Sequence, residues 1–219
     1  MLATAIRLID LGFFRPGGEE YAAENRTYGL ATIRRDHVTC SGEELIFEYP
    51  AKGSKEREQA VADEKVCIVI RGLKRRRSGG DELLAYRTGR RWRDISAGDI
   101  NDYLREISEG DFTAKDFRTW HATVLAAVGL AVSKPATTSE SARKRAIARV
   151  VREVADYLGN TPAVARASYI DPRIIELYER GTTIEPALKD LGKDRDMGEL
   201  ATRGSAEKAV LKLLEKHAA

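Results

Sequence analysis

The sequence predicts an α+β fold: a mainly helical domain with a small β-hairpin or sheet portion in its N-terminal half. Before about residue 95, short runs of alternating and β-branched residues are separated by Gly and Pro turns, which is typical of strands. Beyond Ser96, apolar residues recur every three or four positions, which is the spacing of amphipathic helices. The chain shows no internal repeat and no low-complexity tract, so we expect these two parts to make up the fold.

The N-terminal part starts with a predicted helix over residues 2–13, which a pair of glycines ends. The segment 63–74 fits a helix or, through its CIVI run, a strand. We favour a helix because its apolar residues, Val66 and Ile70 among them, share one helical face. Strands are expected at 29–33, 37–40, 44–49, near 58–61 and at 83–87, with a turn over 50–54.

The helical part carries its own start and stop signals. Ser96 and Thr113 can each cap the helix that follows, because a hydroxyl there accepts a hydrogen bond from the first turn. Gly159 can end a helix, and Pro162 suits the first position of the next one. The expected helices are 97–107, 114–132, 139–158, a short one after Thr161, 172–180 and 205–217, with a polar loop over 192–204.

Composition limits the function classes. With 42% hydrophobic and 32% charged residues, the chain is typical of a soluble globular protein. No apolar run approaches the roughly 18 residues that a membrane span needs, and the first ten residues lack the pattern of a signal peptide. The two cysteines and three histidines have no close spacing, which argues against a structural zinc site and favours a reducing, cytoplasmic compartment. We therefore expect neither a membrane nor a metal as a partner.

The net charge of +3 is too small to identify a partner, but the charge is unevenly distributed. Residues 71–93 contain nine Lys and Arg against two acids. Such a cluster can follow a phosphate backbone, or it can be a solvated surface loop, and composition leaves both open. If the cluster binds DNA, we expect Arg75, Arg76 and Arg91 to contribute contacts.

Five residues could together transfer a phosphodiester without a metal. The transition state of that reaction gains negative charge on the non-bridging oxygens, and guanidinium groups match those oxygens in geometry. The reaction also needs a nucleophile in line with the scissile bond and an acid for the leaving oxygen. A set of two arginines, a lysine, an amide or imidazole donor and a tyrosine would suffice, and such a set can be assembled in this chain. No single member is diagnostic alone, but the local sequence contexts are.

The local contexts of these residues carry a family resemblance. Four stretches resemble the catalytic domain of type IB DNA topoisomerases, and most closely the bacterial, poxvirus-like branch. They are FFRPGGEEY from Phe13, YPAKG from Tyr49, TAKDFRTWHAT from Thr113 and LGNTPAVARASYIDP from Leu158. The last two stretches are the most specific, and the resemblance extends from the first helix to about residue 190.

The resemblance implies a role for each of the five residues. Arg15 and Arg118 match the two arginines that bind the scissile phosphate. Lys52 matches the lysine that protonates the departing 5′-oxygen. Asn160 stands where many relatives have His, as in the bacterial branch, and would donate a hydrogen bond to a non-bridging oxygen. Tyr169 matches the nucleophile that forms a 3′-phosphotyrosyl link.

Two weaker assignments and one departure accompany these roles. Lys115 matches a lysine that assists the second arginine, and Tyr21 matches a contact to a DNA phosphate. Relatives usually have Gly where this chain has Ala51, which would strain a turn with positive φ. The resemblance implies relaxation of supercoiled duplex DNA by a monomer in the bacterial nucleoid, without ATP, metal or another cofactor. We expect residues 1–219 to form the catalytic domain, without the N-terminal β domain that precedes it in the family.

Three members of the set also fit structural roles, and the sequence leaves those alternatives open. Tyr169 could be a half-buried core residue, Arg118 an ion-pair partner of Asp116 or Asp111, and Asn160 the cap of the next helix. A tyrosine recombinase would use the same chemistry, but such enzymes usually have His at the position of Lys115. A non-catalytic DNA-binding module would need the basic residues but not all five members of the set.

Overall fold

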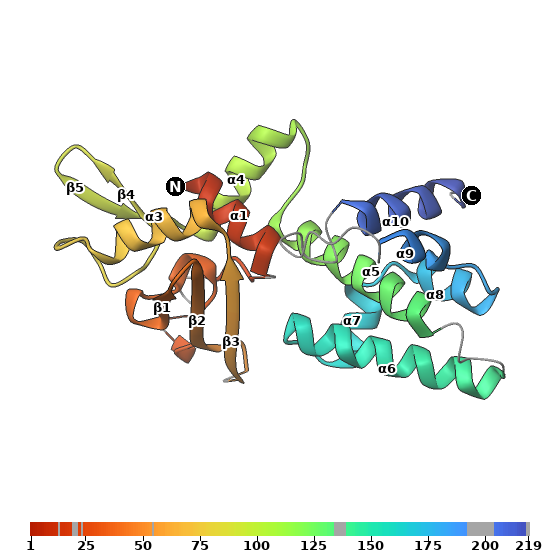
Figure 1. Cartoon of the computed structure of the whole chain (residues 1–219). Helices are drawn as coiled ribbons and strands as arrows, with labels where there is room; N and C mark the ends of the chain where they lie inside the picture. The colour runs from red at the N-terminus through yellow and green to blue at the C-terminus, as the bar shows by residue number, and fades with distance from the viewer. Residues whose placement is uncertain are drawn as a thin grey trace. The chain divides into compact units, whose positions relative to one another are not determined.

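The computed structural model describes residues 1–12, 14–18, 22, 24–53, 55–133, 139–191 and 204–217. The chain divides into two compact units, Met1–Phe117 and Arg118–Ala219. All the strands that the structure describes lie in the first unit, and the described part of the second is helical (Figure 1). A mainly helical chain with small sheets in its N-terminal half is therefore confirmed.

The first unit is built around a three-stranded antiparallel sheet in the order β1-β2-β3. Its strands are β1 (Val38–Ser41), β2 (Glu44–Ala51) and β3 (Lys55–Ala62). On β2 the side chains of Leu45, Phe47 and Tyr49 alternate into the core, as predicted for a half-buried strand. Two predicted helices contact this sheet and bury its inner face, namely α1 (Leu2–Gly12) and α3 (Glu64–Lys74).

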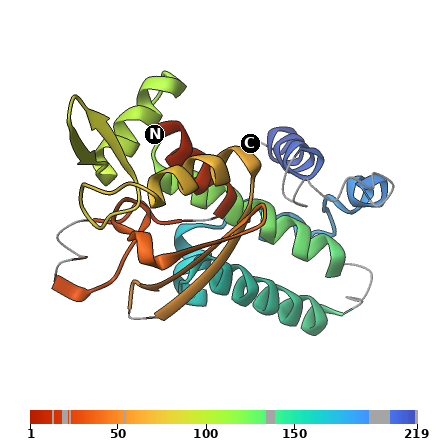
Figure 2. The same cartoon turned by 60° about the vertical axis from the view of Figure 1, so that its left-hand side comes forward.

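A second sheet forms a separate hairpin of two short strands, β4 (Ala85–Thr88) and β5 (Arg91–Asp94). We call this hairpin, residues 85–94, the arginine ribbon. Its turn contains Gly89 at φ +59°, a conformation that glycine adopts without strain. In Figures 1 and 2 the ribbon extends from the first unit on a different side from the β2–β3 turn. The sequence did not predict β5, because four residues with three charges carry no apolar alternation.

The predicted strand 29–33 is wrong. Residues Leu30–Thr32 form a 3₁₀ turn, η1, and Arg35–His37 form a second, η2. The backbone of this segment binds the chain just after α1 instead of a strand: Leu30 N–H donates to the Arg15 carbonyl at 2.8 Å. The two segments approach so closely that a Cβ on Gly29 would lie 2.5 Å from the Gly17 Cα. This contact fixes the backbone of Arg15.

The helix α4 (Ala97–Ser108) completes the first unit. Its predicted cap is confirmed, since the Ser96 hydroxyl accepts from Asp99 N–H at 3.0 Å and the Asp99 carboxylate accepts from Ser96 N–H at 2.8 Å. These hydrogen bonds hold the pKa of the Asp99 carboxyl below its usual value. The capping box therefore depends on an ionised Asp99.

The second unit consists of helices that the sequence mostly located. They are α5 (Ala114–Ser133, which starts in the first unit), α6 (Glu140–Leu158), α7 (Pro162–Ser168), α8 (Pro172–Glu179), α9 (Glu185–Leu191) and α10 (Ser205–Lys216). Only α9 was not expected, and residues 192–203 of the predicted polar loop lie outside the described residues. Gly129 lets α5 approach α6, because a Cβ there would lie 3.1 Å from both methyls of Val150.

Candidate active site

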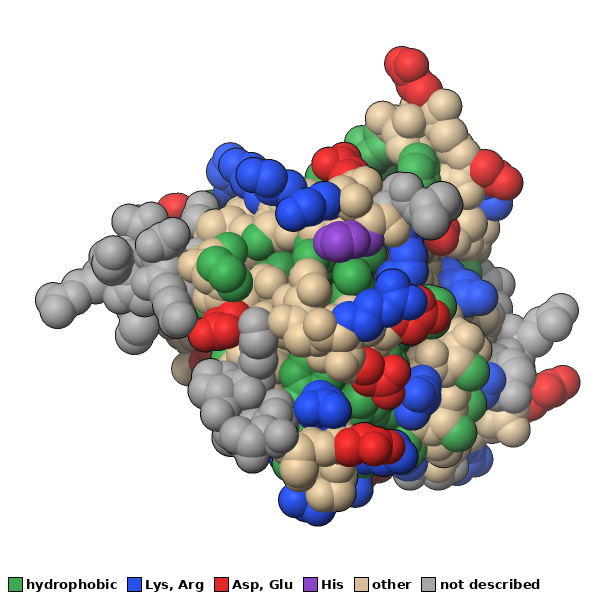
Figure 3. Space-filling view, turned by 90° about the vertical axis from the view of Figure 1, so that its right-hand side faces the viewer, with side chains coloured by type: hydrophobic (Ala, Val, Ile, Leu, Met, Phe, Trp, Pro, Cys, Tyr) green, Lys and Arg blue, Asp and Glu red, His purple; other side chains and the backbone are tan. Residues whose placement is uncertain are grey.

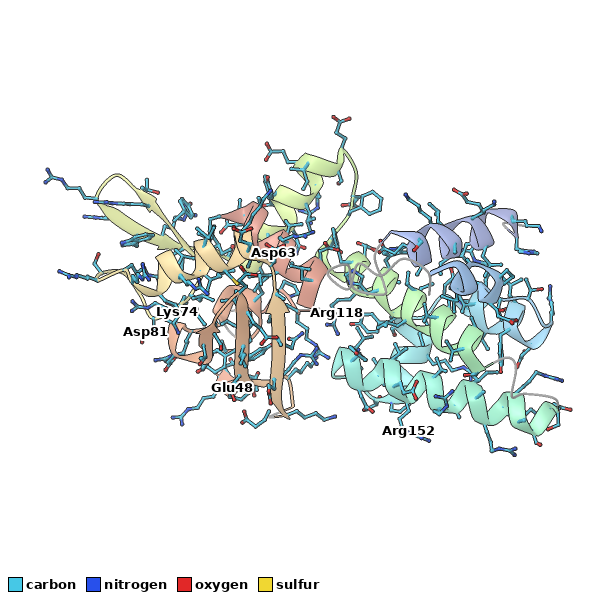
Figure 4. The ribbon with its side chains drawn as sticks, viewed as in Figure 1. Glu48, Asp63, Lys74, Asp81, Arg118 and Arg152 are labelled. Carbon is cyan, nitrogen blue, oxygen red and sulfur yellow. The ribbon has the colours of Figure 1, made fainter. Side chains whose placement is uncertain are left out.

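In the second unit, Arg118 joins the elements that carry two other candidates. Its side chain is buried in α5, with 2% of the residue surface exposed. One guanidinium nitrogen donates to the Leu158 carbonyl at 2.9 Å, and the guanidinium carbon lies 5.4 Å from the centre of the Tyr169 ring. Figure 4 labels Arg118 on α5. The structure thus brings together the second arginine and the tyrosine, as the sequence predicts.

The chemistry of a helix end accounts for a buried arginine at position 118. Leu158 is the last residue of α6, and the carbonyls of a last turn lack intrahelical partners. Gly159 ends the helix in the left-handed conformation at φ +63°, which turns the chain away. The Arg118 guanidinium satisfies the Leu158 carbonyl and meets the partial negative charge at the end of the helix.

Asn160 follows this helix end and is half-buried. Its backbone N–H donates to the Ala155 carbonyl at 2.8 Å, which fixes its position beside the end of α6. The Thr161 hydroxyl, not the Asn160 amide, caps α7 by accepting from Val164 N–H at 3.3 Å. The alternative in which Asn160 caps the next helix is therefore wrong.

Tyr169 stands at the junction that follows α7. It is half-buried, with backbone angles φ −132° and ψ −30°, so it lies just outside the helical conformation. Its N–H still donates to the Ala165 carbonyl at 3.1 Å. The two acids considered as partners of Arg118 bind elsewhere: Asp116 accepts from the Thr113 hydroxyl and N–H, and Asp111 binds Arg105.

In the first unit, Lys52 lies at the tip of the β2–β3 hairpin. It is exposed and follows the last paired residue, Ala51, which is opposite Lys55. The positive φ of this turn belongs to Gly53, at +82°, and Ala51 is part of the strand. The departure of this chain at Ala51 therefore involves no positive φ, and the Lys52 side chain is exposed to solvent.

Arg15 is positioned by the core of the same unit. The preceding residue, Phe14, is fully buried and stacks on Tyr49 at 6.3 Å between ring centres. Arg57, opposite Tyr49 on β3, has its Nε 2.9 Å from the Gln59 side-chain oxygen. Burial lowers the pKa of Arg57, Tyr49 opposes that effect, and the positive charge of Arg15 lowers the pKa further. Two guanidiniums therefore share this end of the sheet.

Arg57 was not among the residues predicted from the sequence. Its signal was present, because alternate residues of β3 face inward and Arg57 and Gln59 precede the buried Val61 in that series. A charged residue at an inward strand position is unusual, and here it places a cation beside Arg15.

Arg76 differs from its predicted role. It was expected to contact DNA, but it is buried, and its guanidinium donates to the Leu83 carbonyl at 2.8 Å, to the Gly80 carbonyl at 3.1 Å and to the Glu82 carbonyl. It also lies 3.8 Å from the Asp94 carboxylate and 5.4 Å from the centre of the Trp92 ring. The Arg76 guanidinium is therefore occupied by main-chain carbonyls and Asp94, and it anchors the base of the arginine ribbon.

The other basic candidates are exposed. Arg75 follows α3, Arg91 lies in the ribbon and Lys115 is in the first turn of α5, whereas Tyr21 lies outside the described residues. Within the described part of the chain, Arg87, Arg90 and Arg91 of the ribbon form no ion pair. By contrast, basic and acidic side chains are intermixed on the face in Figure 3.

Metal-binding clusters and membrane spans are both absent from the described residues. No group of three His, Cys, Asp or Glu side chains lies close enough together there to hold a metal ion. No helix in that part of the chain is both long and apolar enough to cross a membrane.

Comparison with known proteins gives one matching family and several relatives. Residues 1–194 match the family described as the catalytic core of eukaryotic DNA topoisomerase I. The chain is 27% identical over 173 residues to DNA topoisomerase 1B of Acanthamoeba polyphaga mimivirus, covering 75% of this chain and 51% of that protein. It is 21% identical over 180 residues to DNA topoisomerase I of Monkeypox virus, covering 81% and 54%.

A fungal relative, DNA topoisomerase 1 of Candidozyma auris, is 34% identical over 125 residues, which is 56% of this chain and 16% of that protein. The chain thus spans about half the length of these viral relatives and a smaller share of the fungal one.

Proposed function

Because the chain belongs to the family of the eukaryotic DNA topoisomerase I catalytic core, we propose that it relaxes supercoiled duplex DNA as a type IB topoisomerase. It cleaves one strand transiently and rejoins it. The observation that carries the proposal is the buried Arg118 guanidinium between the Leu158 carbonyl and the Tyr169 ring. That contact puts a fixed cation beside a half-exposed phenol, which is what a tyrosine nucleophile for a phosphodiester requires.

In the proposed reaction the Tyr169 oxygen attacks the scissile phosphorus and loses its proton to solvent. A phosphotyrosyl bond forms at the 3′ side, and the bond from phosphorus to the 5′-oxygen breaks. Lys52 gives a proton to that leaving oxygen. One phosphodiester replaces another of similar energy, so the step needs no ATP. The free end rotates about the intact strand, and its 5′-hydroxyl then attacks the phosphotyrosyl bond to restore the DNA.

Charge development in the transition state assigns the remaining roles. Arg15 and Arg118 bind the non-bridging oxygens, because planar guanidiniums donate two hydrogen bonds in a fixed fork. Asn160 donates one more from a neutral amide. Lys115 assists the second arginine, and Tyr21 contacts a neighbouring phosphate. Arg15, Arg118 and Asn160 would act as preorganised donors, which avoids the cost of reorienting solvent during the reaction.

We further infer that the chain belongs to the bacterial, poxvirus-like branch and acts as a monomer in the cytoplasm. Support for the branch comes from the LGNTP sequence, in which Asn160 occupies the position where many relatives have His. The same resemblance supports a fold like that of the tyrosine recombinases.

The arginine ribbon supplies a second set of phosphate contacts in this proposal. Its exposed arginines have no ion pair among the described residues, and like charges on one small hairpin repel each other. A duplex backbone would offset that repulsion. Arg91 in the ribbon and Arg75 at the end of α3 are therefore proposed as DNA contacts, while the buried Arg76 holds the ribbon in place.

The first prediction concerns the nucleophile. Tyr169→Phe keeps the ring over which Arg118 lies but removes the attacking oxygen, so adduct formation and plasmid relaxation should vanish while duplex binding persists. Tyr157→Phe is the matched control, because Tyr157 is 58% exposed on α6 and should be dispensable. Adduct formation is measured as SDS-stable complexes with labelled duplex, and relaxation is measured on a supercoiled plasmid. An active Tyr169→Phe would refute the proposed function, and a wild-type chain that binds DNA without relaxing it would favour a binding module.

The second prediction concerns the general acid. Lys52→Ala should slow single-turnover cleavage by about 10²–10⁴-fold, the usual range for loss of such a group. A substrate whose leaving group is a 5′-thiol needs little protonation, so mutant and wild type should cleave it at similar rates. Lys55→Ala, at the other side of the same exposed turn, is the control and should leave both rates unchanged. Equal defects of Lys52→Ala on both substrates would reject the assigned role.

The third prediction separates the two kinds of arginine near the ribbon. Arg91→Gln should reduce the slope of log affinity against log salt by about 0.9, the value for one lost phosphate contact, with no loss of stability. Arg76→Met should instead destabilise the protein by about 2–4 kcal/mol, because it leaves buried carbonyls without donors. Salt titrations of duplex binding and urea unfolding measure the two effects. An unchanged salt slope for Arg91→Gln would remove the ribbon from the DNA surface.

A further inference from the structure

A buried hydroxyl connects the helix of Arg118 to the backbone of Tyr169. Thr123 lies on α5, five residues after Arg118, with 2% of its surface exposed. Its hydroxyl donates to the Tyr169 carbonyl at 3.3 Å and accepts from the Asp171 N–H at 3.1 Å. The Thr123 side chain therefore binds the backbone on both sides of Ile170, in the short connection between α7 and α8 that contains Tyr169.

The connection Tyr169–Ile170 lies between α7 and α8 and belongs to neither helix, so contacts from outside these helices are needed to fix it. Tyr169 and Ile170 follow the last residue of α7, and both of their N–H groups share one acceptor, the Ala165 carbonyl, at 3.1 Å. The next helix, α8, begins after Asp171. Helix ends fray, so these two hydrogen bonds restrain the segment less than hydrogen bonds within a helix would.

Asp171 fixes the end of this connection that adjoins α8. Its carboxylate accepts from Arg173 N–H at 2.9 Å, which caps α8, and binds the Arg173 guanidinium at 2.6 Å. The contact with Arg173 lowers the pKa of Asp171, so the carboxylate stays ionised, and can cap α8, to lower pH than an isolated aspartate would. The Thr123 hydroxyl then links this fixed point and the Tyr169 carbonyl to α5.

We propose that Thr123 is a positioning residue for Tyr169, and that it sets the distance between the phenol and Arg118. The helix α5 then positions Tyr169 in two ways. Arg118 on this helix places its guanidinium over the Tyr169 ring, and Thr123 on the same helix holds the Tyr169 backbone. The proposal rests on the proposed function, since it assumes that the Tyr169 oxygen attacks a phosphate bound by Arg118.

The expected effect is on rate, not on binding. In-line attack tolerates little error, and a misplacement of about 1 Å can cost about 10²-fold in rate. Loss of the Thr123 hydroxyl leaves the ring contact with Arg118 and the hydrogen bond to Ala165, so a smaller defect of about 10-fold is expected. The same atoms lie at the reaction centre in cleavage and in religation. Both rates should therefore fall together and leave the cleavage equilibrium unchanged.

The experiment compares Thr123→Val, which keeps the shape of the side chain, with Thr123→Ala and Thr123→Ser. The matched control is Ser133→Ala in the last turn of α5. The Ser133 hydroxyl is also buried, donates to the Gly129 carbonyl at 2.6 Å and accepts from Arg149 at 2.6 Å. It lies ten residues beyond Thr123, which is about 15 Å along a helix. The variant Ser133→Ala therefore removes a buried bridging hydroxyl at a position distant from Tyr169.

Single-turnover cleavage, religation, duplex affinity and thermal unfolding would be measured for each variant in the full chain. We expect Thr123→Val and Thr123→Ala to slow both chemical steps by about 10-fold with affinity unchanged, and Thr123→Ser to keep both rates within about threefold of wild type, since it retains the hydroxyl. Ser133→Ala should lower stability comparably without slowing cleavage.

Wild-type cleavage rates in Thr123→Val and Thr123→Ala would overturn the positioning role. So would a Ser133→Ala variant that cleaves as slowly as these, or a Thr123→Ser variant that cleaves as slowly as Thr123→Ala. Those results leave the proposed function standing, because the wild type still cleaves. Absence of any adduct with the wild-type chain would instead reject both.

Discussion

The interaction on which the second unit depends is the burial of the Arg118 guanidinium against the carbonyl that ends α6. A cation with 2% of its surface exposed loses most of its hydration, and a fixed carbonyl at a helix C-terminus is one of the few neutral groups that can offset that loss. The same guanidinium lies over the Tyr169 ring. A single side chain on α5 therefore contacts both the end of α6 and the residue that follows α7.

Burial alone does not distinguish a binding arginine from a structural one. Arg76 and Arg118 are both buried, both donate to main-chain carbonyls and both lie 5.4 Å from an aromatic ring. The difference is in what the ring can do. Trp92 belongs to the base of the arginine ribbon and packs against the core, whereas Tyr169 is a half-exposed phenol at a helix end. The Tyr169 phenol beside Arg118 is accessible to a ligand, whereas the contact of Arg76 with Trp92 stabilises the hairpin.

The sequence located most helices because several of their ends are chemically marked: Ser96 and Gly159 act at the ends that the pattern predicts. It failed at 29–33, where the backbone pairs with the chain after α1, and that pairing depends on a contact between distant segments. The five candidate residues came from motif resemblance, and among the described residues the structure shows the contact of Arg118 with Tyr169. The roles of Thr123 and Arg76 follow from tertiary contacts, which no local pattern encodes.

Arg118 is proposed to serve the fold and the reaction with one planar group, and the variant Arg118→Lys separates the charge of that group from its shape. Lysine keeps the charge but not the fork, so it cannot bind the Leu158 carbonyl and a phosphate oxygen in the same geometry. Single-turnover cleavage of a labelled duplex should fall by about 10²-fold or more, while duplex affinity stays nearly constant. Arg166→Lys, an exposed change on α7, should have little effect. Cleavage by Arg118→Lys at the wild-type rate would contradict the account.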